Sequence, residues 1–161
     1  MKLIPSLLAG ALALGMTGAA VAGTATTSLP VTATITQACA ITATNMQFAD
    51  LTSLSADSGF TGATSQTNIA LTCNDANMNA VIELDAQPMV NLASPADPAI
   101  TYNLFQDAAR TLPWGTEADG TAMTLASVYG KTDLNVFALI PIQDNVVAGA
   151  YSAPINVTVT Y

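Results

Sequence analysis

The chain has 161 residues, with three basic and eleven acidic side chains and no histidine. This length favours a single domain, and the lack of histidine excludes Ser-His-Asp and Cys-His catalysis. A net charge of −8 is unsuited to nucleic acid, whose phosphates attract basic surfaces. We therefore expect neither an enzyme nor a nucleic-acid-binding protein.

The first 22 residues have the pattern of a secretory signal peptide. Lys2 precedes an apolar run over residues 7–21, and Ala20-Val21-Ala22 supplies a small-x-small cleavage signal. The run is short for a membrane span, and no basic residue directly follows it. We expect cleavage between Ala22 and Gly23 and export of residues 23–161, which carry a net charge of −9.

Residues 29–39 predict a β-strand with one apolar face. Apolar and polar side chains alternate here, and a period of two places each set on its own face. The apolar set is Leu29, Val31, Ala33 and Ile35. Such a strand leaves its backbone and apolar face exposed unless it joins a sheet. The alternation leaves open whether that sheet belongs to this chain or to another molecule.

Two cysteines, Cys39 and Cys73, lie in the exported part. In an exported chain a lone pair favours one disulfide. The alternatives are two free thiols or a metal-binding pair. A metal site would lack ligands, because there is no histidine and no second cysteine pair. We expect no metal and no cofactor.

The rest of the exported part predicts about seven short strands separated by polar turns. The expected strands occupy residues 40–43, 67–73, 80–86, 100–105, 123–129, 136–140 and 155–161. Residues 45–62 are rich in Ser, Thr, Asp and Gly and predict a connection. The whole pattern is typical of an antiparallel β-sandwich.

Two groupings of charged residues have simple structural explanations. Glu83 and Asp85 share one face of an expected strand and resemble paired glycosidase carboxylates only loosely. A solvated strand face explains them. Lys131 follows Gly130, and we interpret it as a solvated loop residue rather than as the base of Ser-Lys chemistry.

Residues 102–115 resemble the signature of the spore coat protein U domain. The block reads Tyr-Asn-Leu-Phe-Gln-Asp-Ala-Ala-Arg-Thr over 102–111, followed by Trp114-Gly115. The closing segment, Gly149-Ala150-Tyr151 and then an alternating strand, is also similar to that family. At the start, Ile35 stands four residues before Cys39, as the last apolar donor residue does in the family. The family includes subunits of archaic, Csu-type chaperone–usher pili.

The resemblance implies an all-β fold, namely an incomplete immunoglobulin-like antiparallel β-sandwich completed by donor-strand exchange. Residues 23–37 would be the donor strand segment, and residues 38–161 the pilin domain. The contact residues of the donor would be the apolar set of residues 29–35. The edges of the acceptor groove would be formed by Ile41 and by Ile155, Val157, Val159 and Tyr161.

The implied function is that of a structural subunit of a secreted pilus that supports adhesion and biofilm formation. Its partners would be a periplasmic chaperone, an outer-membrane usher and neighbouring subunits in a head-to-tail polymer at the cell surface. One alternative is a self-contained exported sandwich that pairs its N-terminal strand with its own sheet and binds a small ligand or glycan. The other is a coat protein of the same domain family that forms no fibre.

Overall fold

The structure, a computed structural model, describes residues 23–161. The expected signal peptide lies outside these residues, as does Ala22 of the expected cleavage site. The chain divides between Thr34 and Ile35 into two units, which we describe separately. The helical structure in residues 23–161 is the single short turn Ala56–Ser58, and none of it is long and apolar enough to cross a membrane.

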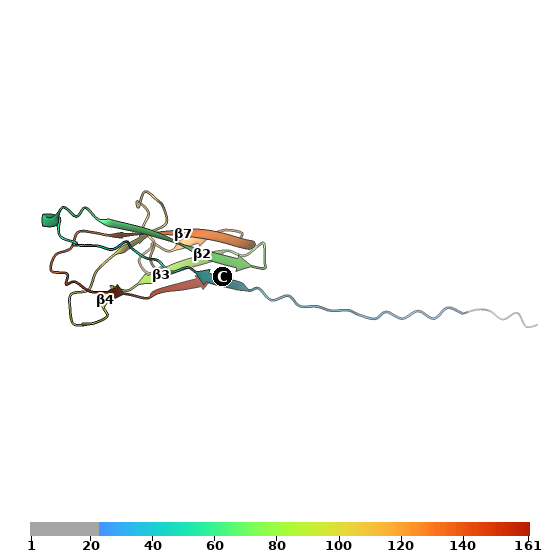
Figure 1. Ribbon diagram of the computed structural model, residues 1–161. Coiled ribbons are helices and arrows are strands. Elements are labelled where there is room, and N and C mark those ends of the chain that lie inside the picture. Colours follow the sequence, from blue (N-terminus) through green and yellow to red (C-terminus); the bar gives the residue numbers. More distant parts are fainter. Residues whose placement is uncertain (1–22) are drawn as a thin grey trace, which may run out of the picture. The chain divides into compact units, whose positions relative to one another are not determined.

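Residues 35–161 form antiparallel sheets (Figure 1). The strands are β1 Cys39–Ala43, β2 Ala63–Cys73, β3 Ala80–Ala86, β4 Val90–Asn91, β5 Asn103–Phe105, β6 Met123–Leu125, β7 Gly130–Ile140, β8 Tyr151–Ser152 and β9 Ile155–Thr160. One sheet has the order β1-β2-β7-β5, a second has the order β6-β3-β9, and β4 pairs with β8. The predicted all-β antiparallel sandwich is confirmed.

The core lies between the first two sheets and is built from alternate residues of their long strands. The side chains that face inward and are buried include Ile69 and Leu71 of β2, Ile82 and Leu84 of β3, and Val136 and Ala138 of β7. Asp85 of β3 is exposed. The period of two therefore places apolar residues on one face and polar residues on the other.

The longest ladder joins β2 to β7, and it corrects two expectations. It contains eleven residue pairs, from Ala63 opposite Ile140 to Cys73 opposite Gly130, so both strands begin earlier than predicted. Lys131 was expected in a loop, but it lies in β7 opposite Thr72 and pairs with Asp133, with 2.8 Å between Nζ and Oδ1. These strand ends carry polar side chains toward solvent, which made them look like turns in the sequence.

Two other expected strands are shorter than predicted. The strand expected over residues 123–129 ends at Leu125, and Ser127 then has a positive φ of 57° that no regular strand contains. The strand expected over residues 100–105 begins only at Asn103. Ile100 instead forms an isolated bridge with Met89.

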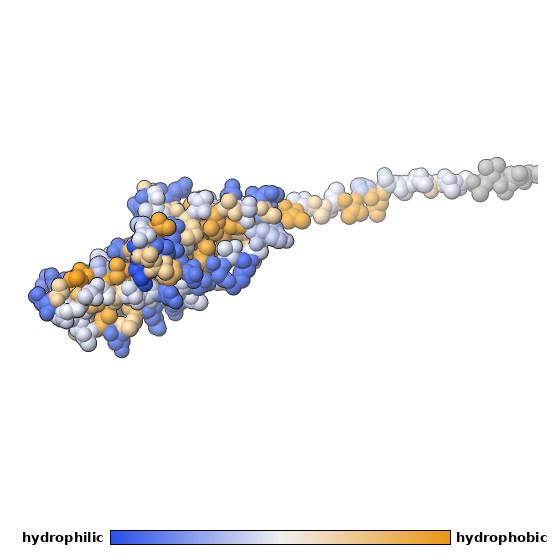
Figure 2. Space-filling model, turned by 90° about the horizontal axis from the view of Figure 1, so that it is seen from above, coloured by the Kyte–Doolittle hydropathy of each residue, from blue (hydrophilic) through white to orange (hydrophobic). Residues whose placement is uncertain are grey.

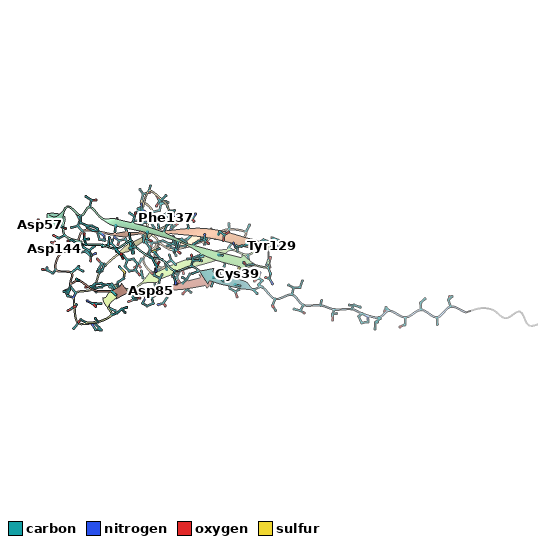
Figure 3. All side chains as sticks on the ribbon, viewed as in Figure 1. Cys39, Asp57, Asp85, Tyr129, Phe137 and Asp144 are labelled. Carbon is teal, nitrogen blue, oxygen red and sulfur yellow. A yellow bond between two sulfur atoms is a disulfide. The ribbon has the colours of Figure 1, made fainter. Side chains whose placement is uncertain are left out.

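The disulfide between Cys39 and Cys73 is present and confirms the predicted pairing. The two residues lie directly opposite each other on β1 and β2. The bond closes a loop of 34 residues, which contributes about 4 kcal/mol on the chain-entropy model. Cys39 lies toward the opposite end of the domain from the loops that carry Asp57 and Asp144 (Figure 3).

The sequence did not predict the short β4–β8 pair, which depends on a buried amide. Asn91 is 2% exposed; its Nδ2 donates to Asp97 Oδ2 (3.1 Å), and its Oδ1 accepts from the Ala93 N–H (3.0 Å). Gly149 lies against this amide, and a Cβ there would be 2.6 Å from Nδ2. The glycine that opens the closing segment is therefore required by a close approach rather than by a turn.

The block at 102–115 joins the two large sheets. The Trp114 backbone N–H donates to the carbonyl of Leu104 in β5 of the first sheet, at 2.9 Å. Its buried indole Nε1 donates to the carbonyl of Ile82 in the second sheet, at 3.0 Å. The carbonyl of Gly115 accepts from the Leu84 N–H at 3.0 Å. The most distinctive stretch of the sequence is thus a structural crossing between sheets.

Asp107 organises the loop within this block. Its Oδ1 accepts from the backbone N–H groups of Leu112 (2.8 Å) and Thr111 (3.0 Å), and its Oδ2 accepts from the Thr111 hydroxyl (2.8 Å). The Leu112 bond is the main reason that the pKa of the Asp107 carboxyl lies below its ordinary value of 3.8. These bonds favour the ionised form in the folded state.

Asp107→Asn should remove a pH-dependent part of the stability. Because the folded-state pKa is lowered, the contribution of Asp107 is present above the unfolded pKa and is lost as the pH falls through the folded value. We expect the wild type to exceed the variant in urea midpoint at pH 6, with the difference narrowing below about pH 4. An equal difference at pH 6 and pH 2.5 would contradict this assignment.

Candidate functional site: an open groove between the sheets

Each large sheet ends on a strand that has only one partner among the described residues. β1 pairs only with β2, and β9 pairs only with β3. Ile155 and Val157 of β9 are half-buried, whereas Leu84 of β3, opposite Val157, is buried. The core is therefore covered at β3 and open beside β9.

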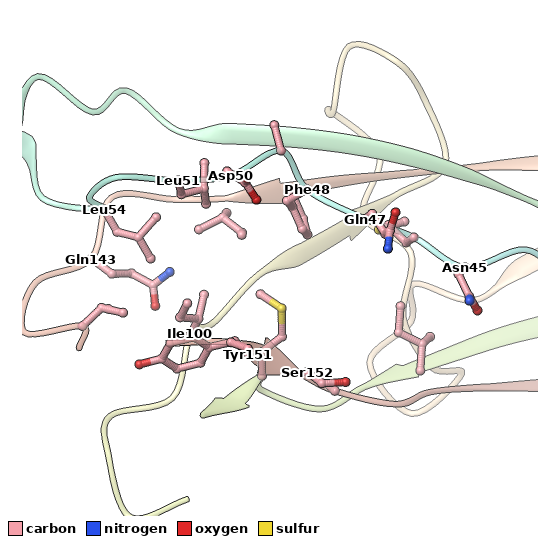
Figure 4. Close-up of a pocket in the computed structure, with 18 of the residues that line it drawn as sticks. Asn45, Gln47, Phe48, Asp50, Leu51, Leu54, Ile100, Gln143, Tyr151 and Ser152 are labelled. Atoms are coloured by element: carbon pink, nitrogen blue, oxygen red, sulfur yellow. The ribbon is translucent and has the colours of Figure 1, made fainter. Parts of the chain in front are cut away.

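A groove of about 1190 Å³ lies at this opening, between residues 43–55 and residues 145–157. Figure 4 shows Phe48 and Leu51 on one side of it and Tyr151 on the other. Core residues of both sheets reach its inner surface, including Ile69, Leu84, Val136 and Ile140. The apolar core therefore forms the floor of the groove, where these four side chains are at most 2% exposed.

One wall of the groove, residues 44–55, is extended but is not a strand. The Thr44 N–H donates to the carbonyl of Asn68 at 3.1 Å, and the Ser65 hydroxyl donates to the carbonyl of Gln47. Within the described chain, the N–H groups of residues 45–53 make no backbone–backbone hydrogen bond. This wall therefore presents free backbone donors beside an apolar surface.

One end of the groove is held by the side chain of Gln143. Its Oε1 accepts from the Thr101 N–H (2.8 Å) and hydroxyl (2.9 Å), and its Nε2 donates to the Thr101 carbonyl (2.8 Å). The Gln143 N–H also donates to the carbonyl of Leu54 at 2.9 Å. Gln143 therefore connects the wall at residues 44–55 to the loops that precede β5 and follow β7.

Of the five residues predicted to edge the groove, Ile155 and Val157 line it. Val159 packs against the main core, and Tyr161 is 53% exposed. Ile41 lies opposite Leu71 and is 37% exposed, but it is outside the groove lining. The edge expected at Ile41 is formed further along the chain, by residues 44–55. Three apolar residues in that polar stretch, Phe48, Leu51 and Leu54, were the available signal.

The strand expected over residues 29–39 is formed only from Cys39 onward. Leu29 and Val31 are 84% and 89% exposed, Ile35 is 87% exposed, and Ala33 is exposed as well. No strand pairing in residues 23–161 includes residues 29–35, and a strand needs a hydrogen-bonded neighbour. The space-filling view shows hydrophobic residues along this segment without strongly hydrophilic ones (Figure 2). Their pairing with another molecule stays a prediction.

The groove offers apolar surface and backbone hydrogen bonds rather than reactive groups. In residues 23–161 no cluster of three or more His, Cys, Asp or Glu side chains could hold a metal ion. Asp50 is the acidic residue of the wall at residues 44–55 that lines the groove. The arrangement is suited to binding an extended polypeptide.

A family model described as the Spore Coat Protein U domain matches residues 25–158. Among solved structures, a similar chain is found in the CsuC–CsuE chaperone–tip adhesion subunit pre-assembly complex from archaic chaperone–usher Csu pili of Acinetobacter baumannii. The TM-score is 0.53 at 16% identity, covering 80% of this chain and 40% of that chain. The likeness shows a shared immunoglobulin-like fold. A search of curated proteins gave no match.

Proposed function

The chain belongs to the Spore Coat Protein U domain family, and from this premise we propose that it is a structural subunit of a chaperone–usher pilus. The observation that carries the proposal is the open groove of about 1190 Å³ beside the unpaired edge of β9. This volume exceeds the roughly 300–1,000 Å³ typical of small-molecule sites. A polypeptide strand is the occupant that fits a groove with an apolar floor and free backbone groups along one wall.

The donor segment that we propose is residues 29–35 of a second copy of this chain. It carries alternating apolar residues and no charge, as the apolar groove requires. Seven extended residues span about 20 Å, which is similar to the length of β9, Ile155–Thr160. Inserted between β9 and the wall at residues 44–55, this segment would complete the sandwich.

Burial of the donor residues would stabilise the junction. Leu29, Val31 and Ile35 would each contribute roughly 1.5–3 kcal/mol on full burial. Ladder hydrogen bonds to β9 and to the wall at residues 44–55 would add about 1 kcal/mol each. The acceptor also gains, because Ile155 and Val157 would become covered.

The same groove explains the proposed partners. A free subunit leaves Ile155 and Val157 half-covered and Leu51 exposed at the groove, so a periplasmic chaperone would cover the groove before assembly and an outer-membrane usher would receive the subunit. The similar solved chain comes from a chaperone–subunit complex, which supports a chaperone partner. A head-to-tail contact that does not close produces a filament, here one exported to the cell surface for adhesion and biofilm formation.

The alternative of a self-contained sandwich requires residues 29–35 to pair within their own domain. Leu29, Val31 and Ala33 lie outside the unit that holds the core, which favours a donor role instead. A coat protein of the same family would share the fold without forming a fibre. Polymerisation therefore distinguishes these functions.

The proposal predicts that purified residues 23–161 form oligomers that survive SDS without heating. Unheated gels at increasing protein concentration should show a ladder that collapses to one band on boiling. Hydrogen exchange should show β9 protected in the oligomers. A stable monomer at every concentration, with residues 29–35 protected from exchange, would instead establish the self-contained sandwich.

A further inference from the structure

The three residues before β1 are bound to the turn that follows β2. The side chain of Asn74 accepts from the Ala38 N–H through Oδ1 and donates to the Thr36 carbonyl through Nδ2, both at 2.9 Å. The Asn74 N–H also donates to the carbonyl of Ala38 at 3.2 Å. The carboxamide therefore acts like one more peptide group and extends the β1–β2 ladder beyond the disulfide.

A second contact lies beside the first. Gln37 Nε2 donates to Asp75 Oδ2 at 2.8 Å, and Asp75 Oδ1 accepts from the Asn77 N–H at 2.9 Å. The bond from Asn77, followed by that from Gln37, lowers the pKa of the Asp75 carboxyl, because both bonds favour the ionised form. We call Asn74 and Asp75, with the residues 36–38 that they bind, the exit clamp.

We infer that the exit clamp prevents the chain from reversing before β1, so that residues 29–35 cannot insert into the groove of their own domain and are kept for a second copy. This inference rests on the proposed donor role. Asn74 and Asp75 would thereby favour polymerisation over self-insertion.

β1 runs from Cys39 toward the groove wall at residues 44–55, so self-insertion would require the chain to reverse before β1 into a hairpin, which would bring residue 29 opposite residue 45 at the near end of the groove. Residues 36–38 would form its loop, and three residues are a common length for such loops. A loop turns the backbone away from the extended form, in which the Thr36 carbonyl and the Ala38 N–H point to the same side. The single carboxamide of Asn74 could not hold both groups after the reversal.

Wherever no chaperone covers the groove, self-insertion has a kinetic and thermodynamic advantage over polymerisation. A donor tethered by a few residues faces its own groove at an effective concentration in the millimolar range. Neighbouring subunits at micromolar concentration would compete poorly. Fixing residues 36–38 in an extended form removes this competitor without changing the donor or the groove.

The test is Asn74→Ala in purified residues 23–161, with Asn77→Ala as the matched control. Asn77 joins the clamp through its backbone N–H, which the control retains. Loss of the two carboxamide bonds should raise the monomer fraction on unheated gels by about fivefold. Residues 29–35 should become protected from hydrogen exchange in that monomer. The added substitution Val31→Asp should abolish this protection.

An unchanged monomer fraction in Asn74→Ala, beside a normal wild-type ladder, would overturn the clamp and leave the pilus subunit proposal standing. Absence of the ladder in the wild type would overturn both. If Asn74→Ala gives little folded protein, the variant Gln37→Ala is used in its place, because it removes only the bond to Asp75. It should raise the monomer fraction in the same direction by a smaller factor, and no rise would overturn the clamp.

Discussion

Val31→Asp should abolish fibre assembly and leave the folded domain and its chaperone complex intact. Val31 lies in the unit that ends at Thr34 and is not among the residues of the core cluster. In the groove of a neighbour, an unpaired carboxylate would meet apolar side chains such as Val136 and Val157 at a cost of several kcal/mol. Co-expression with chaperone and usher would allow the soluble complex and the surface fibres to be measured separately.

The control is Thr32→Asp, which adds the same charge one residue away. Successive strand residues point to opposite faces, so this carboxylate would stay in solvent and fibres should form. Loss of the soluble subunit in Val31→Asp would mean that residues 29–35 belong to the core of their own domain. The donor-strand proposal would then give way to the self-contained sandwich.

Trp114→Ala should lower the free energy of unfolding by about 3–5 kcal/mol, the range for a large buried aromatic residue. Trp114 is 2% exposed and packs among core residues of both large sheets. The substitution would open a cavity there and leave the carbonyl of Ile82 without its indole donor. Urea unfolding followed by circular dichroism would measure the loss.

Trp114→Phe separates the two effects in the same assay. Phenylalanine keeps much of the ring volume but cannot donate to Ile82, so the loss should be about 1–3 kcal/mol. A loss in Trp114→Ala below about 1 kcal/mol would contradict the role of this block as the crossing between the sheets. The resemblance carried by residues 102–115 would then have no structural explanation.

The alternation of side chains predicted the strands that lie against the core. β3 begins and ends as expected, and β9 differs by one residue, because the inward residues of each strand are more apolar and less exposed than the residues that alternate with them. β2 and β7 extend past the core, and only their inner parts alternate strongly. Lys131 is in a strand because β2 runs beside it. The residues near Lys131 in the sequence show no alternation that would predict this pairing.

The groove wall and the β4–β8 pair depend on contacts between distant residues. The wall at residues 44–55 is placed by Ser65 and Gln143, and β4 is placed by Asn91 against Gly149. None of these contacts produces a periodic pattern of apolar residues in the sequence. The resemblance implied a groove beside β9 with Ile41 at its other edge; the cavity found there is lined by residues 43–55 on that side, and the acceptor role of its edges stays a prediction.

The position of the Cys39–Cys73 bond has a mechanical consequence. In a fibre joined by donor strands, a pull along the fibre would reach this domain through the residues that precede Cys39. The bond lies at the first residue pair of β1, so tension would pass covalently into β2 before any β1 hydrogen bond is loaded. From β2 the force would spread over eleven residue pairs shared with β7. Under reducing conditions the same pull would act on the five pairs of β1 alone, and extension of the domain would begin there.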